Sequence, residues 1–294
     1  MSTISTVGAG IPMDVLAATS RYAGPLGWDL QRPTPRADSW LESKFAPWTR
    51  SILEDWADGA LDHLDCVIFS RAEDNAHRLY YYVCELRSRG LITGPEPLVF
   101  DVAYLNRASS LAHTIDAVRR LAARFDLDQT ALERGIAATN LARRAPAGTP
   151  RPPVCLLAGS APPDRRLHDV IDAQGWSASG ETLHEQWQRL GAAVEQASGD
   201  AAVAIGRQLH AERRGPRAPS DPASELAAEA HRAGARAAVL WFTEEDEALA
   251  WHLPAMRRAM EGEGIPVLTL VRRSWRADDG VGAEIADFLG STAG

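Results

Sequence analysis

The sequence predicts an α/β protein in which short buried strands alternate with amphipathic helices in both halves of the chain. Two observations carry this prediction. Apolar runs with β-branched residues are followed by a polar turn and then a helical apolar period, first over residues 64–86 and again from residue 154. Residues 145–153 (APAGTPRPP) are rich in Pro and Gly and predict a domain boundary. We therefore expect two domains with parallel sheets.

Composition and charge exclude several classes of protein. The chain has 294 residues, enough for two domains of ordinary size, and its formal net charge of −8 argues against nucleic acid as a main partner. No apolar run approaches the ~20 residues that a membrane-spanning helix needs. The N-terminus has neither the basic start nor the apolar core of a signal peptide. The three isolated cysteines are typical of buried, reduced thiols, so we expect a cytoplasmic protein without membrane contact.

The N-terminal sixty residues (1–60) are expected to form a helical or irregular segment that wraps over the first domain. A short helix begins near Ile11, with Pro12 in its first turn. Four tryptophans follow, at positions 28, 40, 48 and 56, interleaved with prolines. The ordinary interpretation of these indoles is aromatic packing.

The first domain is expected over residues 61–150 and begins with the stretch around which the chain is organised. Residues 66–69 (CVIF) predict a strand, and 70–73 a polar turn. Asp74 or Asn75 can cap the helix that follows, whose Leu79, Val83 and Leu86 share one face. Open α/β sheets bind ligands at the carboxyl ends of such strands, so residues 70–75 are expected to form one wall of a site.

The remaining elements follow in the same alternation. In the first domain we expect a strand at 98–100, a helix over 111–125, and a second helix opened by a capping box at 130–133. The second domain, 151–294, is expected to contain strands at 154–158, after Trp176, at 237–242 and at 265–270. Its helices are expected near 167–171, 201–209, 226–233, 254–262 and 281–289.

Five stretches of the chain, in order, are IPMDVLAA, EDNAHRLYYYVCELR, TALERGIAATNLARR, VCLLAGSAPPDRRLHDVIDAQGW and AMEGEGIPVLTLVRR. In this order they resemble the 2-hydroxyacyl-CoA dehydratase and benzoyl-CoA reductase family, and the resemblance covers the chain from about residue 11 to residue 289. The resemblance implies two flavodoxin-like (Rossmann-like) domains with a site between them. It also implies a [4Fe-4S] cluster held by three cysteines, an ATP-driven activator that supplies an electron, an acyl-CoA substrate that loses water, and pairing as a heterodimer.

The sequence departs from this family at the cluster. The resemblance assigns the ligand cysteines to positions that hold Glu73, the run 182–184, and the run 244–246 in this chain. Cys66 and Cys155 fall in predicted strands and Cys84 in a predicted helix, whereas cluster thiolates need loops that converge. We therefore expect that the chain does not hold the family's cluster in the family's way, which leaves its cofactor unknown.

Oxygen and nitrogen donors occupy these positions instead. The resemblance would bring Glu73, His184 and the acidic loop after residue 243 together, and we assign catalytic roles to Glu73, His184 and Asp246. Glu73, His184 and Glu245 would suit Zn, Mn or mononuclear Fe. Clustered carboxylates also raise one another's pKa values, which suits acid–base work. The alternative is that the acidic loop is a solvated face and that Glu73 only caps a helix.

Four further residues are candidates for substrate binding. Ser70 ends the first predicted strand of the organising stretch, and Gly159 and Ser160 follow a later strand, where backbone N–H groups could meet an anion. Arg213 lies in an Arg- and Pro-rich loop and could meet the phosphates of CoA, although such residues are commonly only solvated.

Three functions remain open at this stage. The chain could be a lyase-type subunit that works beside a paralogous partner, or beside a second copy of itself, on an acyl thioester or related acid. It could be a stand-alone lyase or transferase that uses carboxylates and His, with or without a metal. It could also be a non-catalytic scaffold whose Trp-bearing N-terminal segment forms the interface.

Overall fold

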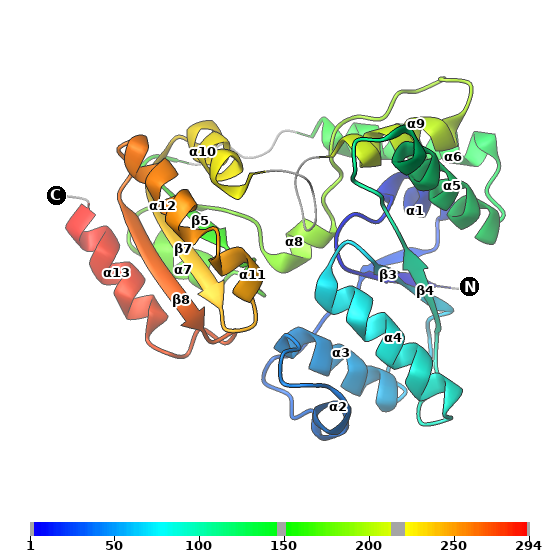
Figure 1. Cartoon of the computed structure of the whole chain (residues 1–294), viewed down its shortest axis with the longest axis horizontal. Coiled ribbons are helices and arrows are strands. Elements are labelled where there is room, and N and C mark those ends of the chain that lie inside the picture. Colours follow the sequence, from blue (N-terminus) through cyan, green and yellow to red (C-terminus); the bar gives the residue numbers. More distant parts are fainter. Residues whose placement is uncertain (1–2, 146–150, 213–220, 293–294) are drawn as a thin grey trace. The chain divides into compact units, whose positions relative to one another are not determined.

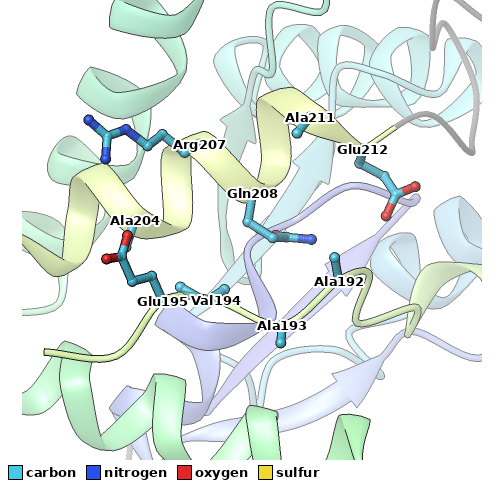
Figure 2. A pocket seen from close by; sticks show the side chains of 9 residues that line it. All are labelled: Ala192, Ala193, Val194, Glu195, Ala204, Arg207, Gln208, Ala211 and Glu212. Carbon is cyan, nitrogen blue, oxygen red and sulfur yellow. The ribbon is translucent and has the colours of Figure 1, made fainter. Parts of the chain in front are cut away.

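The chain folds into two compact α/β units, each built on a four-stranded parallel sheet (Figure 1). The computed structural model describes residues 3–145, 151–212 and 221–292. Unit 1 comprises Met1–Pro146 and Trp187–Pro219, and unit 2 comprises Ala147–Gln186 and Ser220–Gly294. The predicted class, α/β with two Rossmann-like parallel-sheet domains, is confirmed. The unit boundaries differ from the expected 1–60, 61–150 and 151–294, because 187–219 returns to unit 1.

The sheet of unit 1 has the strand order β2-β1-β3-β4. Its strands are β1 (Ile4–Val7), β2 (Tyr22–Pro25), β3 (Cys66–Ser70) and β4 (Glu96–Phe100). Its helices are α1 (Met13–Thr19), α2 (Pro35–Trp40), α3 (Pro47–Ala57), α4 (Asp74–Ser88), α5 (Ala108–Arg124), α6 (Gln129–Arg143) and α9 (Ala201–Ala211). Strand β3 is buried along its whole length, as its continuous apolar run predicts.

Strand β1 corrects the expectation for the N-terminal segment. Residues 1–60 do not only wrap the first domain, since β1 lies at the centre of its sheet, between β2 and β3. The sequence ISTV is short and half polar, so its β-branched residues alone do not predict a central, fully buried strand. Its hydroxyls are accommodated locally, because Ser5 Oγ donates to Gly24 O at 2.7 Å and Thr6 Oγ1 lies 3.0 Å from Tyr22 Oη.

A buried ionic network fastens the returning segment to unit 1. Arg143, on α6, pairs with Asp14, on α1, through two contacts of 2.8 Å, and their side chains are only 6% and 2% exposed. The same guanidinium donates to Leu190 O at 2.8 Å. Asn140 exchanges two hydrogen bonds with the backbone of Val194, at 2.8 and 3.0 Å. Residues of two stretches that carry the family resemblance therefore act here as scaffold.

Aromatic and glycine packing complete this attachment. Trp187 lies edge-on to Trp48 and Trp28, with ring centroids 4.9 and 5.1 Å away, so the returning segment begins on an aromatic anchor. Helices α1 and α6 approach so closely that a Cβ on Gly135 would lie 2.1 Å from Asp14 O. Residues 187–200 show no helical or strand period, because their fold depends on these long-range contacts.

The sheet of unit 2 has the equivalent order β6-β5-β7-β8. Its strands are β5 (Val154–Gly159), β6 (Ser177–Ser179), β7 (Ala235–Thr243) and β8 (Val267–Arg273). Its helices are α7 (Arg166–Ala173), α10 (Pro222–Ala233), α11 (Glu247–Ala250), α12 (Leu253–Gly262) and α13 (Val281–Thr292), and α8 (Leu183–Trp187) crosses from unit 2 into unit 1.

Alternate residues of β5 and β7 bury themselves on opposite faces of this sheet. Leu157 and Trp241 pack among α7 and α13, whereas Leu156 and Leu240 pack among α10 and α12. Both faces are therefore covered, as Figure 1 shows for the red and orange elements. This explains why the sequences of these strands are apolar without alternation.

The helix starts differ in detail from the expected ones. Helix α6 is capped by Asp128, whose side chain accepts from Ala131 N at 2.7 Å, and not by the predicted box at 130–133. Helix α4 has Glu73 at its N-cap position, with no side-chain cap bond, in place of Asp74 or Asn75. No helix in the described part of the chain is long and apolar enough to cross a membrane.

Candidate functional site

Each sheet has one topological switch point, where ligands of open α/β sheets bind. In unit 1 the strand order reverses between β1 and β3, and in unit 2 it reverses between β5 and β7. We call the loops after β1 and β3 (8–12 and 71–73) the unit 1 switch point. The loops after β5 and β7 (160–165 and 244–246) are the unit 2 switch point. Most of the predicted site residues lie at one of these two edges.

Ser70 and Glu73 hold the backbone of the β1 loop at the unit 1 switch point. Ser70 Oγ donates to Ala9 O and accepts from Ala72 N at 3.1 Å, and Ser70 is buried. Glu73 is half-buried, and its Oε2 accepts from Ala9 N at 3.2 Å. The close approach requires glycine before Ala9, since a Cβ on Gly8 would lie 2.7 Å from Ser70 Cβ, and Gly8 has φ +96°. The expected wall at 70–75 therefore contains the Glu73 carboxylate, which the hydrogen bond from Ala9 N holds in place.

Tyr104 is a site residue that sequence reasoning missed. It follows β4, and its hydroxyl would lie 3.1 Å from a Cβ on Gly10 in the β1 loop. Burial, helped by the charges of Glu212 and Asp101, raises the pKa of Tyr104 to about 12. Its hydroxyl is consequently a proton-bearing donor at neutral pH. The only available signal was a tyrosine shortly after a predicted strand.

A second polar group lies at the carboxyl end of β4. Asp101 directly follows this strand, and its Oδ2 accepts from Arg71 Nη1 at 2.5 Å and lies 3.1 Å from His113 Nε2. All three side chains are partly exposed. Such an arrangement stabilises the loop between β3 and α4, although exposed ion pairs contribute little to stability.

At the unit 2 switch point, a hydrogen bond joins two of the residues predicted to belong to the site. Ser160 Oγ donates to Asp246 Oδ2 at 2.8 Å and accepts from Thr243 N at 3.1 Å. The other carboxylate oxygen of Asp246 accepts from Leu249 N at 3.3 Å, so it caps α11. Both carboxylate oxygens of Asp246 thus accept hydrogen bonds that hold the loop and the start of α11. Its catalytic role stays a prediction.

The expected anion cradle at Gly159 and Ser160 is not formed as predicted. Ser160 N donates to Trp241 O at 2.8 Å, so this N–H is already used within the sheet. Gly159 has φ +104°, and a Cβ there would lie 2.2 Å from the same carbonyl oxygen. The glycine is required by close approach of two strands, and this explains its presence without an anion.

Glu245 is the most perturbed carboxylate of the acidic loop. Its Oε2 accepts from Trp275 Nε1 at 2.8 Å. Burial raises the pKa of Glu245, and the hydrogen bonds that it accepts only partly oppose this. Its neighbour Glu244 is exposed and pairs with Arg272 at 2.9 Å. The expectation of a solvated acidic face therefore holds for Glu244 but not for Glu245.

His184 lies in the first turn of α8, within a reciprocal capping box. Thr182 N donates to Glu185 Oε2 at 2.7 Å, and Glu185 N donates to Thr182 Oγ1 at 3.3 Å. Burial alone would raise the pKa of Glu185, but the hydrogen bonds from Thr182 outweigh it and hold that pKa below its usual value. The polar loop predicted at 180–185 therefore ends in a helix start, with His184 half-buried beside it.

The predicted metal site has no support from the described residues. Glu73 belongs to unit 1, whereas His184 and Glu245 belong to unit 2. Over residues 3–145, 151–212 and 221–292, no group of three or more His, Cys, Asp or Glu side chains is arranged to hold a metal ion. The metal assignment stays a prediction. Arg213, predicted to bind substrate, lies outside the described residues.

The cysteines do not fit an iron–sulfur cluster. Cys66 is buried in β3 and Cys155 in β5, and burial raises their thiol pKa values to about 11 and about 12. Cluster ligands are thiolates, which these environments disfavour. Cys84 lies in the interior of α4 and not on a loop. The expectation that this chain does not hold the family's cluster in the family's way stays a prediction.

Comparison of the chain with protein-family models finds no match, and comparison with curated proteins finds none either. The resemblance to the dehydratase family thus rests on the quoted sequence stretches alone. What the molecule does must be argued from its own residues.

Proposed function

We propose that this chain is an atypical subunit of the 2-hydroxyacyl-CoA dehydratase type. It would act in the dehydration or reduction of an acyl thioester or related acid, beside a partner subunit that keeps the [4Fe-4S] cluster. The observation that carries the proposal is the contrast between buried, protonated thiols and a polar unit 1 switch point. Such a chain has side chains that can transfer protons but no thiolates to hold an electron-carrying cluster. The partner subunit would therefore supply the electron.

The residues of the unit 1 switch point supply the acid–base part of this chemistry. Tyr104 keeps its proton at neutral pH and can donate a hydrogen bond to a thioester carbonyl oxygen. Glu73 is held by Ala9 N and can accept a proton from a bound acid. Ser70 positions the β1 loop between them through Ala9 O.

Anaerobic co-purification with candidate family partners tests the proposal. We expect a complex whose visible spectrum shows an iron–sulfur chromophore, and no such chromophore for this chain alone. In the complex, Tyr104→Phe and Glu73→Gln should lower turnover, while Tyr81→Phe, at an exposed position on α4, should not. A chain that joins no partner, or that binds iron and sulfide by itself, contradicts the proposal.

A second candidate is a stand-alone, redox-neutral lyase or transferase. It is favoured by Glu245, a half-buried carboxylate whose raised pKa suits a group that takes an α-proton as a base and returns a deuteron as an acid. The isolated chain would then catalyse exchange of the α-proton of an acyl thioester with deuterium oxide. Loss of exchange in Glu245→Gln, but not in Glu244→Gln, supports this candidate, and absence of any exchange removes it.

A scaffold role is favoured by one surface residue. Trp251, at the end of α11, is 82% exposed, and exposed tryptophans are enriched at the centres of protein interfaces. If the chain is a scaffold, Trp251→Ala should weaken assembly with its partner without changing the fold. A complex that forms equally well with this variant counts against the role.

A further inference from the structure

The four edge strands of the two sheets differ in how well they could accept a further strand. They are β2 and β4 in unit 1, and β6 and β8 in unit 2 (Figure 1). Strand β6 has only three residues, and β2 shifts in register against β1 and ends at Pro25. Short strands, irregular register and prolines protect an edge from pairing with another chain. Strand β8 has seven residues without proline, and its one irregularity, at Arg272 with φ +55°, follows a regular run over 267–271.

The edge of β4 is interrupted by a proline on its outward side. Glu96 N donates to Asp65 O at 2.8 Å, so the backbone groups of residues 96, 98 and 100 face β3. Those of residues 97 and 99 face away from the sheet, and Pro97 has no N–H to offer there. A further strand beside β4 would therefore lack one of its hydrogen bonds.

The same alternation leaves β8 with an uninterrupted edge. Ala238 lies opposite Val267, and Ala238 N donates to Pro266 O at 2.9 Å, so residues 266, 268 and 270 face β7. The N–H and C=O groups of Val267, Thr269 and Val271 therefore face outward. Within the residues that the structure describes, these groups have no hydrogen-bond partner. The edge is also accessible, since Val271 is 45% exposed.

We propose that β8 pairs with β8 of a second copy of this chain, antiparallel about a two-fold axis at Thr269. In this register Val267 lies opposite Val271 of the partner subunit, and Thr269 lies opposite the partner's Thr269. Facing residues of such pairs exchange two hydrogen bonds, so all three outward residues find partners. A register shifted by two residues in either direction would pair one of them with residue 265 or 273, outside the regular run.

The side chains along this edge are complementary to themselves. The register brings β-branched Val267 against the partner's Val271, and it brings the two Thr269 hydroxyls together, each of which is buried without a partner in the described chain. Both kinds of cross-strand pair stabilise antiparallel strands. Exposed Glu263 precedes β8 and exposed Arg272 ends it, so antiparallel pairing also brings opposite charges near each other. A second copy supplies this whole pattern by symmetry, which an unrelated peptide would have to match residue by residue.

Sedimentation velocity of the full chain over a range of concentrations tests this pairing. We expect a reversible dimer. Val271→Lys should raise its dissociation constant about tenfold or more, because it places a charge in an apolar cross-strand pair. The matched control is Val99→Lys on the edge of β4, where Val99 is 42% exposed, and this variant should dimerise like wild type. Circular dichroism of both variants checks that they fold.

Hydrogen exchange of the wild-type chain gives a second measurement that needs no variant. Protection of the Val267, Thr269 and Val271 amides should rise with protein concentration, whereas the Val99 amide should exchange at one rate throughout. The proposal is overturned by a chain that stays monomeric at every concentration, or by edge amides that exchange equally fast in monomer and dimer. A dimer that Val271→Lys leaves intact, or that Val99→Lys weakens equally, overturns it as well.

Discussion

The two switch points use the same residue types and connect them differently. In unit 2, Ser160 and Asp246 bond to each other across the β5 and β7 loops, and the second oxygen of Asp246 caps α11. In unit 1, Ser70 and Glu73 come from the same side of the crevice, and each bonds the backbone of Ala9 instead. A hydroxyl and a carboxylate at equivalent edges therefore join two loops in both units, through each other in unit 2 and through the backbone of Ala9 in unit 1.

The two units also differ in how they hold their long-range connections. Unit 1 adds a buried ion pair between Asp14 and Arg143 to its apolar core, whereas the core of unit 2 is formed by apolar packing against both faces of β5 and β7. The comparison teaches that equal topology does not require equal chemistry. Four experiments test this difference between the two units.

The largest effect is expected from the buried pair. Arg143→Met leaves the Asp14 carboxylate buried without its partner, and we expect unit 1 to lose about 3–5 kcal/mol of unfolding free energy. Its matched control is Arg272→Met in unit 2, which removes an exposed pair with Glu244 and should cost about 0–1 kcal/mol. Urea unfolding followed by tryptophan fluorescence measures both. Similar losses would mean that the buried network does not distinguish unit 1.

Helix packing gives the next effect. A methyl group at Gly135 would clash with Asp14 O and would lie 2.9 Å from Ala18 Cβ, so Gly135→Ala should destabilise unit 1 by about 1–3 kcal/mol. In unit 2, Gly282→Ala on α13 meets only Val170 Cγ2, at 3.5 Å, and should stabilise by about 0.4–1 kcal/mol. Thermal unfolding compares the two. Stabilisation by both substitutions would rule out the close approach of α1 and α6.

The serine cross-links can be compared directly. Ser160→Ala removes the acceptor of the buried Thr243 N–H, and Ser70→Ala removes the acceptor of Ala72 N–H. Each should cost about 1–3 kcal/mol, in its own unit. Hydrogen exchange of the two amides measures the local effect. Unchanged protection at Thr243 in Ser160→Ala would show that the unit 2 lock does not depend on the hydroxyl.

The smallest effect concerns acid sensitivity, which we expect in unit 2. His168 is buried, and burial lowers its pKa, while its Nε2 lies 3.0 Å from Gly180 O. Above the usual histidine pKa of about 6.5 it is neutral in both states and adds no pH dependence. Below that pH the unfolded chain binds the proton more readily, so the stability of unit 2 should fall as pH falls.

Urea unfolding of wild type and His168→Gln between neutral and mildly acidic pH checks this expectation. The variant should lose less stability than wild type over that range, because glutamine does not titrate. Equal pH dependence in the two proteins would assign the acid sensitivity of unit 2 to other groups.

Part of the site could be predicted and part could not. The placement of Ser70, Glu73, Ser160 and Asp246 at or just after the carboxyl ends of strands could be predicted, because a buried strand is an apolar run followed by polar residues. Their catalytic and binding roles stay predictions. Tyr104 was missed because its importance comes from contact with Gly10, far away in the chain. The anion cradle at Ser160 was wrong because a neighbouring strand supplies the acceptor for its N–H.

The sequence alone determined the α/β class and the strands β3, β5 and β7, because a strand buried on both faces must be continuously apolar. It also determined that no cysteine lies on a loop. The place of β1 at the centre of a sheet, despite its short and half-polar sequence, emerges only from long-range contacts. The same holds for residues 187–212, which rejoin unit 1. Strand β1 and the returning segment both depend on contacts with residues distant in the chain. Thr6 lies 3.0 Å from the Tyr22 hydroxyl, and Leu190 O accepts from Arg143. Local sequence patterns do not predict such contacts.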